Sequence, residues 1–500
     1  MYYLSTRGET KEVKSAQAIA HGLSNDGGLY VPESFPKLTL DKITELAKEP
    51  YSKRAAYIMS LFLTDFSIEE LIKYTSDAYS VNEKSGFSHV EIAPLKKIDS
   101  NTHFLELWHG PTSAFKDMAL QVMPYLLTAS LGKSGESREI CILVATSGDT
   151  GKAALEGFRD VNGTKIMVFY PKDGVSEVQK LQMTSQKGTN VNVVAVDGNF
   201  DDAQTGVKAI FSDEKLRDEL DSRKCFLSSA NSINWGRLVP QIAYYVSSYC
   251  DLLDRDEIKP GEKVNYCVPT GNFGNILAAY YSERMGLPVN KLICASNRND
   301  VLTQFINTGV YDKNRPFYTT VSPSMDILVS SNLERLLYEL SGKNGKIVAS
   351  YMSSLSSDGS YKIPDNVQKE LTRVFASGHC SEEDTAKTIN NTFKNSDYLI
   401  DTHTAVAYKV LGDYRAATGD STTSVVVSTA SPFKFCEAVL DALGQASTKK
   451  DISLIDTLSE VTGVAVPTPL AQLKGKESRF DKAVAIDGMK DAVIAFIEGW

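Results

Sequence analysis

The chain has 500 residues, 42% of them hydrophobic and 23% charged, which is enough for two or three globular domains. Its formal net charge of −9 argues against non-specific binding to nucleic acid or to anionic membranes. No stretch approaches the roughly 20 apolar residues of a membrane span. We therefore expect no nucleic-acid and no membrane partner.

The seven cysteines are scattered and form no CxxC pair, which disfavours a zinc cage or a disulfide framework. We expect no metal site. A cysteine set of this kind suits a reducing compartment, and the N-terminus has neither a signal-peptide nor a transit-peptide pattern. The expected location is the cytoplasm.

Residues 1–95 are expected to form a mostly helical N-terminal region. Apolar residues recur at helical spacing in 40–48 and 55–66. Turn-forming residues at 23–32 interrupt this pattern.

From about residue 100, short apolar β-branched runs alternate with amphipathic helical segments. The expected strands are 140–145, 165–170, 191–196, 264–268, 292–296 and 425–428. Helices are expected to follow from about 150, 176, 200, 275 and 432. Such alternation predicts parallel sheets covered by helices on both faces. In these sheets ligands bind at the carboxyl ends of the strands.

A lysine stands at the start of one expected helix, in the segment 107–120. Lys116 follows Phe115 and a Gly-Pro turn at 110–111. Lysine forms Schiff bases with carbonyl groups, and it must be partly desolvated to be a free amine near neutral pH. Taken alone, a lysine is far more commonly a solvated surface charge, so this assignment depends on the surrounding motifs.

The segment 145–154 joins a strand to a helix through small residues. Ser147, Gly148 and Thr150 could bind a carboxylate through hydroxyl and backbone N–H groups. The alternative is an ordinary helix start, with Asp149 or Thr150 as the N-cap.

A second strand-to-helix junction, at 264–279, is rich in glycine. Its loop consists of Gly271, Asn272, Phe273, Gly274 and Asn275. Glycines allow a tight turn, and the free N–H groups of a helix start attract phosphate. The chain has neither GxGxxG nor a Walker motif here, so a phosphate other than that of a dinucleotide or nucleoside triphosphate is favoured. An ordinary turn remains the alternative.

A third junction, at 424–435, places Ser428 and Thr429 at the carboxyl end of an expected buried strand. These hydroxyl groups could contact a ligand or simply cap the next helix.

Together these segments resemble the threonine synthase family, within the fold-type II enzymes that use pyridoxal 5′-phosphate. The matching segments are 7–9, 25–32, 108–120, 146–153, 229–238, 269–275 and 429–435, in family order over nearly the whole chain. The long N-terminal region resembles the larger branch of the family, found in fungi and many bacteria.

The resemblance implies a pyridoxal-phosphate enzyme that converts O-phospho-L-homoserine and water to L-threonine and phosphate. It implies that Lys116 carries the cofactor as a Schiff base, beside Phe115, and moves protons on the substrate. The loop 271–275 should hold the cofactor phosphate, and Thr429 should bond the pyridine nitrogen. The substrate carboxylate should bind Ser147, Gly148, Asp149 and Thr150. Asp149 should also face the cofactor 3′-oxygen, so one of these two groups should carry a proton.

The substrate phosphate needs donors of its own, and 229–237 is the best local candidate. Arg237 can make a bidentate phosphate contact, with Asn231, Ser232 and Asn234 as further donors. The alternative is a polar loop with a surface arginine. Lys152 is a weaker candidate for the same task. His109 either orients a loop or is a satisfied structural histidine.

The fold-type II resemblance, which is to the tryptophan synthase β-like fold, implies an α/β protein with two α/β domains and parallel-rich sheets. A smaller domain at 135–235 should close over the substrate. Residues 96–134 and 236–500 should form the large cofactor-binding domain, in a monomer or homodimer. Two alternatives stay open: a phospho-lyase that releases 2-oxobutyrate, and a non-catalytic protein with this fold.

Overall fold

The N-terminal region combines helices with a small sheet. The computed structural model describes residues 1–82, 85–173, 175–449 and 451–499. Strands β1 (Tyr2–Ser5), β2 (Val13–Lys14) and β3 (Tyr30–Pro32) form an antiparallel sheet in the order β2-β1-β3. The helices of this region are α1 (Ser15–His21), α2 (Leu40–Leu46), α3 (Tyr51–Phe62) and α4 (Ile68–Ala78). The helices expected at 40–48 and 55–66 are confirmed as α2 and α3. The strands β1, β2 and β3 are too short to show a periodic pattern in the sequence.

The larger domain is built on a six-stranded sheet. Its order is β14 (Phe375–His379), β11 (Val289–Ser296), β10 (Val264–Pro269), β15 (Ser424–Ser428), β5 (Thr102–Glu106) and β4 (Leu95–Lys97). All neighbours are parallel except β4 and β5. The sheet is covered by helices that include α11 (Trp235–Asp254), α12 (Gly274–Met285) and α18 (Thr402–Thr418).

The smaller domain has a five-stranded parallel sheet. Its order is β16 (Ala483–Val484), β8 (Val191–Val196), β7 (Thr164–Pro171), β6 (Glu139–Ala145) and β9 (Cys225–Ser229). Its helices are α7 (Asp149–Phe158), α8 (Glu177–Thr184), α9 (Phe200–Ser212), α10 (Glu214–Ser222) and α22 (Met489–Glu498). The strands β6 to β8 are apolar and almost wholly buried, because helices lie on both faces.

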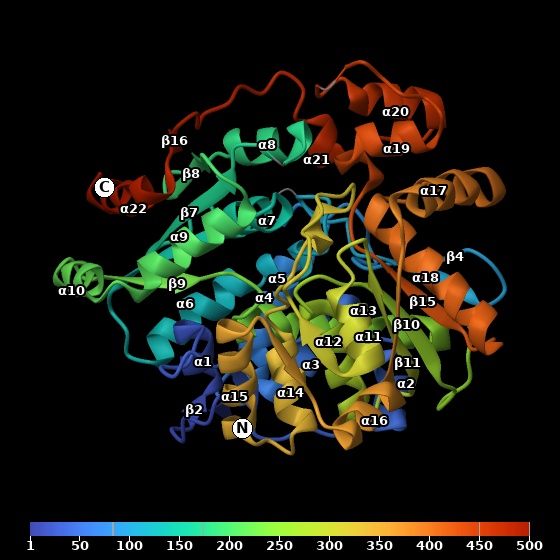
Figure 1. Ribbon diagram of the computed structural model, residues 1–500, viewed down its shortest axis with the longest axis horizontal. Coiled ribbons are helices and arrows are strands. Elements are labelled where there is room, and N and C mark those ends of the chain that lie inside the picture. Colours follow the sequence, from blue (N-terminus) through green and yellow to red (C-terminus); the bar gives the residue numbers. More distant parts are fainter. Residues whose placement is uncertain (83–84, 174, 450, 500) are drawn as a thin grey trace.

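The last residues of the chain return to this smaller sheet (Figure 1). β16 pairs with the edge strand β8, and α22 packs beside α9. This differs from the expectation that all of 236–500 lies in the larger domain. A two-residue strand gives no detectable pattern in the sequence, so the pairing could not be seen there.

The remaining elements surround the larger sheet. The helices are α5 (Asp117–Leu120), α6 (Met123–Lys133), α13 (Val301–Thr308), α14 (Leu333–Leu340), α15 (Gly345–Ser357), α16 (Asp365–Val374), α17 (Glu382–Ser396), α19 (Cys436–Ala442), α20 (Leu454–Thr462) and α21 (Thr468–Ala471). The strands β12 (Val310–Asp312) and β13 (Ser360–Lys362) form a ribbon. Short 3₁₀ turns are η1 (Pro323–Met325), η2 (Pro432–Lys434) and η3 (Ile486–Gly488).

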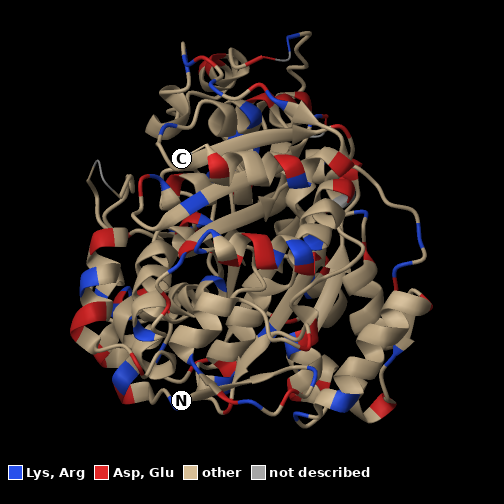
Figure 2. Cartoon of the chain, turned by 90° about the vertical axis from the view of Figure 1, so that its left-hand side faces the viewer, with Lys and Arg blue, Asp and Glu red and all other residues tan. Residues whose placement is uncertain are grey.

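Charged residues of both signs are interspersed over the face in Figure 2. Among the described residues, no helix is long and apolar enough to cross a membrane.

Candidate active site

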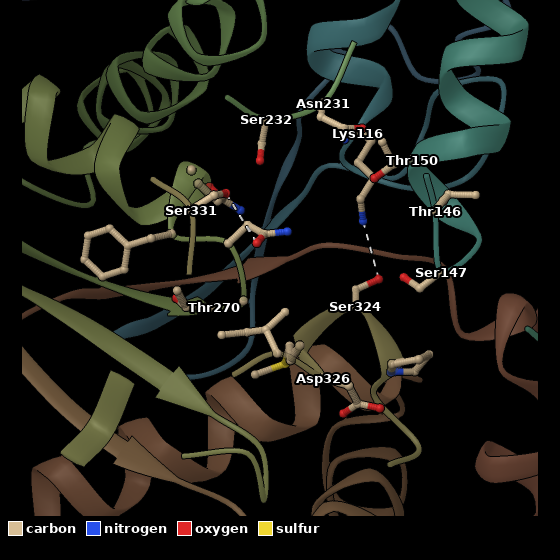
Figure 3. Close-up of a pocket in the computed structure, with 18 of the residues that line it drawn as sticks. Lys116, Thr146, Ser147, Thr150, Asn231, Ser232, Thr270, Ser324, Asp326 and Ser331 are labelled. Atoms are coloured by element: carbon tan, nitrogen blue, oxygen red, sulfur yellow. Dashed lines mark hydrogen bonds between the residues drawn. The ribbon is translucent and has the colours of Figure 1, made fainter. Parts of the chain in front are cut away.

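A cavity of about 220 Å³ lies where the carboxyl ends of strands from both α/β sheets meet. Figure 3 shows Lys116 between two groups of side chains: Thr146, Ser147 and Thr150 on one side, and Ser232 and Thr270 on the other. The segments singled out in the sequence at 115–116, 146–150, 231–237, 271–275 and 429 all contribute to its wall.

A backbone hydrogen bond of the preceding residue positions Lys116 at the start of α5. The N–H of Phe115 donates to the Thr429 carbonyl at 2.8 Å, which ties this turn to the end of β15. The Lys116 side chain is only 11% exposed, and its Nζ lies 3.4 Å from Ser324 Oγ and 3.6 Å from Asp149 Oδ2. Burial lowers the pKa of Lys116, and the nearby cations of Lys434 and Arg237 add to this effect. A lysine in this environment is a better nucleophile toward a carbonyl group.

The loop at 271–275 has the geometry of a phosphate cradle. Phe273 adopts a left-handed conformation with φ of 61°, which is uncommon for a bulky residue and typical of functional sites. The buried Asn275 Nδ2 has no hydrogen-bond partner among the described atoms, although Oδ1 accepts from Tyr244 and Tyr245. A free donor beside the start of α12 suits an anionic group.

A side chain at Gly271 would collide with the η1 turn, which borders this loop, and would displace the loop. A Cβ there would lie 2.6 Å from the Ser324 carbonyl oxygen, too close for any real contact. We expect Gly271→Ala to weaken binding of pyridoxal phosphate by about tenfold or more, since forced overpacking costs about 1–3 kcal/mol. The measurement is an absorbance titration of cofactor-free protein. Gly132→Ala is the control, because nothing lies within 4 Å of a Cβ there. Equal affinities in the two variants would contradict the cradle.

Asp149 forms a buried ion pair that the sequence did not reveal. Lys434 Nζ lies 2.9 Å from Asp149 Oδ1, and the two side chains are 0% and 3% exposed. Gln179 Nε2 donates to the same oxygen at 2.8 Å. Burial alone would raise the pKa of Asp149, but the charges of Lys434 and Lys116 outweigh it and hold this pKa well below the usual range. Asp149 is therefore ionised.

Neither Asp149 nor Thr150 is the cap of α7. The Thr146 hydroxyl takes that task, because it accepts from the N–H groups of Gly148 and Gly151 at 2.9 Å each. The hydroxyls of Ser147 and Thr150 consequently remain on the cavity wall (Figure 3). Gly148 supplies the bend before the helix, with φ of 129°, and it does not line the cavity.

Arg237 is a buried cation that has no counter-ion among the described residues. It is 3% exposed and lines the cavity near Asn231 and Ser232. Nη1 donates to the Ala230 carbonyl, and Nε has no partner among the described atoms. Burial lowers the pKa of Arg237 to about 10. It also stands in the first turn of α11, where the helix dipole disfavours a cation. Such a residue is stabilised by an anionic ligand.

Two of the candidates for the substrate phosphate do not line the cavity, and of the carboxylate candidates Gly148 and Asp149 do not line it either. Asn234 is the N-cap of α11: Oδ1 accepts from Gly236 N at 2.8 Å, and Nδ2 donates to the Ile19 carbonyl at 2.9 Å. Lys152 pairs with Glu156 at 2.8 Å. Their polar groups are already bonded, so neither is free to bind a substrate phosphate.

The capping role of Asn234 leads to a prediction about stability. Asn234→Ala should lower the free energy of unfolding by about 1–2 kcal/mol, because a helix cap is lost. Urea unfolding measures this change. The kcat/KM of the folded variant should stay close to that of the wild type. A loss of kcat/KM as large as that of an Arg237 variant would show that Asn234 takes part in substrate binding.

His109 is a structural histidine. Its Nε2 lies 2.6 Å from Glu106 Oε2, and its ring stacks on Trp108 with centroids 4.3 Å apart. It does not line the cavity.

Several site residues were missed in the sequence. Lys434 lies within the matching segment 429–435, so its position was a usable signal. Ser324 and His403 lie in segments without a recognised motif. The N–H of Ser324 donates to His403 Nε2 at 3.2 Å, and His403 Nδ1 lies 2.8 Å from Asp401 Oδ2. Because Nε2 accepts the bond from Ser324, the ring proton of His403 lies on Nδ1, next to Asp401. The same bond holds the η1 turn beside Lys116.

A desolvated lysine, a helix start with a free amide donor and two mainly parallel sheets are the features of a pyridoxal-phosphate enzyme of fold type II. In agreement, residues 90–430 match the pyridoxal-phosphate-dependent enzyme family. Residues 2–79 match the threonine synthase N terminus, and 404–497 match the threonine synthase C-terminal family. The chain belongs to the threonine synthase family.

Relatives and solved structures agree with this placement. Threonine synthase of Pseudomonas aeruginosa is 41% identical over 89% of this chain and 91% of its own length. Human threonine synthase-like 1 is also 41% identical, over 86% of this chain and 58% of its own length. The crystal structure of threonine synthase with bound pyridoxal phosphate from Brucella melitensis has a TM-score of 0.87 and 35% identity, covering 99% of each chain.

The family and the donor set both fit pyridoxal phosphate as the cofactor. Lys116 would offer the amine for its aldehyde. The unpartnered Asn275 amide and the start of α12 offer donors for its phosphate.

Proposed function

We propose that this enzyme converts O-phospho-L-homoserine and water to L-threonine and phosphate. The observation that carries this proposal is Arg237, a buried cation that pairs with no carboxylate in the described part of the chain and that lines the same cavity as Lys116. A substrate with a phosphate group would supply the missing charge.

The reaction moves protons and exchanges one oxygen. The bond between Cγ and the phosphate ester oxygen breaks, and the phosphate leaves with the electron pair and takes up one proton. Cβ loses one proton and bonds the oxygen of water, which releases its other proton, and Cγ gains one proton to become a methyl group. When bound, pyridoxal phosphate supplies an electron sink for the carbanion next to the amino group. Lys116 is the proposed base that takes and returns protons at the substrate carbons, because its pKa is lowered by burial.

The other residues bind and orient. Ser147 and Thr150 are proposed to bind the substrate carboxylate, and Asn231 and Ser232 to assist Arg237 at the phosphate. The loop 271–275 is proposed to hold the cofactor phosphate.

Two groups set the electronics of the cofactor ring in this proposal. Thr429 offers a neutral hydroxyl to the ring nitrogen, which does not strongly favour its protonation. Ionised Asp149, paired with Lys434, leaves the proton to the cofactor 3′-oxygen.

The small domain carries Ser147 and Thr150, whereas the larger one carries Lys116 and the cradle. We propose that the small domain closes over the substrate and keeps water out until the addition step. Small-angle scattering with and without substrate tests this closure, and identical curves would contradict it.

Product analysis tests the reaction itself. The enzyme with its cofactor is incubated with O-phospho-L-homoserine, and amino acids, 2-oxobutyrate and phosphate are quantified together. We expect L-threonine and phosphate in equal amounts. Phosphate with 2-oxobutyrate and without threonine would replace this proposal by a phospho-lyase. Absence of any turnover would favour a non-catalytic protein.

A further inference from the structure

A second and larger cavity adjoins the active site. Its volume is about 1080 Å³, against about 220 Å³ for the first, and we name the two the outer and the inner cavity. Their linings share Ala145, Gln204, Lys208, Asn231 and Ile233. Five common residues place the two cavities next to each other.

The outer cavity lies between the N-terminal region and the small domain. One wall is the turn that follows α1, from His21 to Gly27. The facing wall is formed by α9, α10 and the strand β9. The outer cavity therefore separates the N-terminal region from the small domain.

In the outer cavity the carboxylates are paired with cations, whereas two of the cations have no carboxylate partner among the described residues. Its two carboxylates are both compensated, since Asp213 pairs with Lys490 at 2.6 Å and Asp221 pairs with Arg138. By contrast, neither Lys208 nor Arg217 has a carboxylate within ion-pairing distance among the described residues. The uncompensated charge of the outer cavity is therefore positive, and Lys208 places part of it at the junction with the inner cavity.

We propose that the outer cavity is the route by which the phosphorylated substrate reaches the active site and phosphate leaves it, with Lys208 as the residue that attracts the phosphate at the junction. This inference rests on the proposed function, because it needs an anionic substrate. Arg237 holds the phosphate at the end of the route, and Arg217 adds positive charge at its outer part. A cationic passage raises the local concentration of an anion and the rate of its association.

Lys208 variants test the route through association rather than chemistry. The enzyme with bound cofactor is assayed with O-phospho-L-homoserine at ionic strengths of about 20 mM and about 300 mM. Lys208→Gln should lower kcat/KM about fivefold at the lower ionic strength, as for one partly exposed ion pair, with kcat little changed. Lys208→Glu should lower kcat/KM further, whereas Lys208→Arg should keep the wild-type value. The differences should shrink at the higher ionic strength.

A matched control separates the route from the overall charge. Lys215 is also exposed and lies on α10, but it lines neither cavity. Lys215→Gln removes the same charge and should leave kcat/KM unchanged. Competitive inhibition by inorganic phosphate should weaken in Lys208→Gln and not in Lys215→Gln.

Equal kcat/KM and equal phosphate inhibition in the Lys208→Gln and Lys215→Gln variants would overturn the route. That result differs from a failure of the proposed function, in which the wild-type enzyme itself would form no threonine.

Discussion

Lys116→Ala is expected to abolish turnover, with a loss of at least about 10⁴-fold, because the variant lacks both the amine that bonds the cofactor and the base that moves protons. The absorbance band expected near about 410–420 nm for the lysine-bound cofactor should disappear as well. The folded protein should persist, since the Lys116 side chain makes long polar contacts to Ser324 and Asp149 and a contact with the ring of Phe115, its neighbour in the chain.

Two further variants make the Lys116 result specific. Lys116→Arg keeps a cation beside Asp149 but cannot form the Schiff base, so it should be as inactive as Lys116→Ala. Lys215→Ala removes an exposed lysine and should retain both band and activity. A Lys116→Ala protein that kept the band would show that another lysine carries the cofactor.

Arg237→Ala is expected to lower kcat/KM for O-phospho-L-homoserine by about 10²–10³-fold, since a buried charged contact to phosphate is lost. Cofactor affinity should change far less, because the cradle at 271–275 is intact. The unliganded protein should not lose stability, because the variant removes an uncompensated buried charge. Steady-state kinetics, cofactor titration and thermal unfolding measure the three effects. Equal losses of substrate use and cofactor binding would contradict the assignment.

Arg335 provides the contrast for Arg237. It is also fully buried, but its Nε donates to the Tyr30 carbonyl at 3.0 Å, and its terminal nitrogens bond Asn332 and the Ile233 carbonyl. Arg335→Ala should therefore lower the unfolding temperature, since three buried acceptors lose their donor. Arg237→Lys should fall between Arg237→Ala and the wild type in kcat/KM, because it keeps the charge without the bidentate geometry.

Six parallel strands, β6, β7, β8, β10, β11 and β15, could be predicted from the sequence because each is a largely continuous apolar run. The parallel strands β5, β9, β14 and β16 were not predicted, because they are short or carry polar residues. The strand expected at 191–196 is found as β8, and that at 140–145 as β6. The junction after β15 was predicted less well: a 3₁₀ turn occupies 432–434, and α19 begins at Cys436. Pro432 and the Ser431 cap favour a 3₁₀ turn at this point. The apolar periodicity of the helix that follows does not show that a separate turn precedes it.

The site could be predicted only where its residues share a junction. Lys116, the loop 271–275 and Thr429 each follow a strand or begin a helix, so local sequence marks them as candidates, whereas their expected roles came from the resemblance to the family. The pair of Asp149 with Lys434 spans 285 positions of the chain and depends on how the two sheets meet. The distinction between Arg237 and Asn234 depends on which side of one helix turn faces the cavity, and polar character alone cannot show that.

The pairing of β16 with β8 affects how the chain folds during its synthesis. The small sheet begins at residue 139, but its last strand is made only after 482 residues have been assembled. Until then β8 presents an open edge, which can pair with another chain. A nascent or C-terminally truncated chain should therefore aggregate more readily than the full-length one, and the final residues protect an edge formed some three hundred residues earlier.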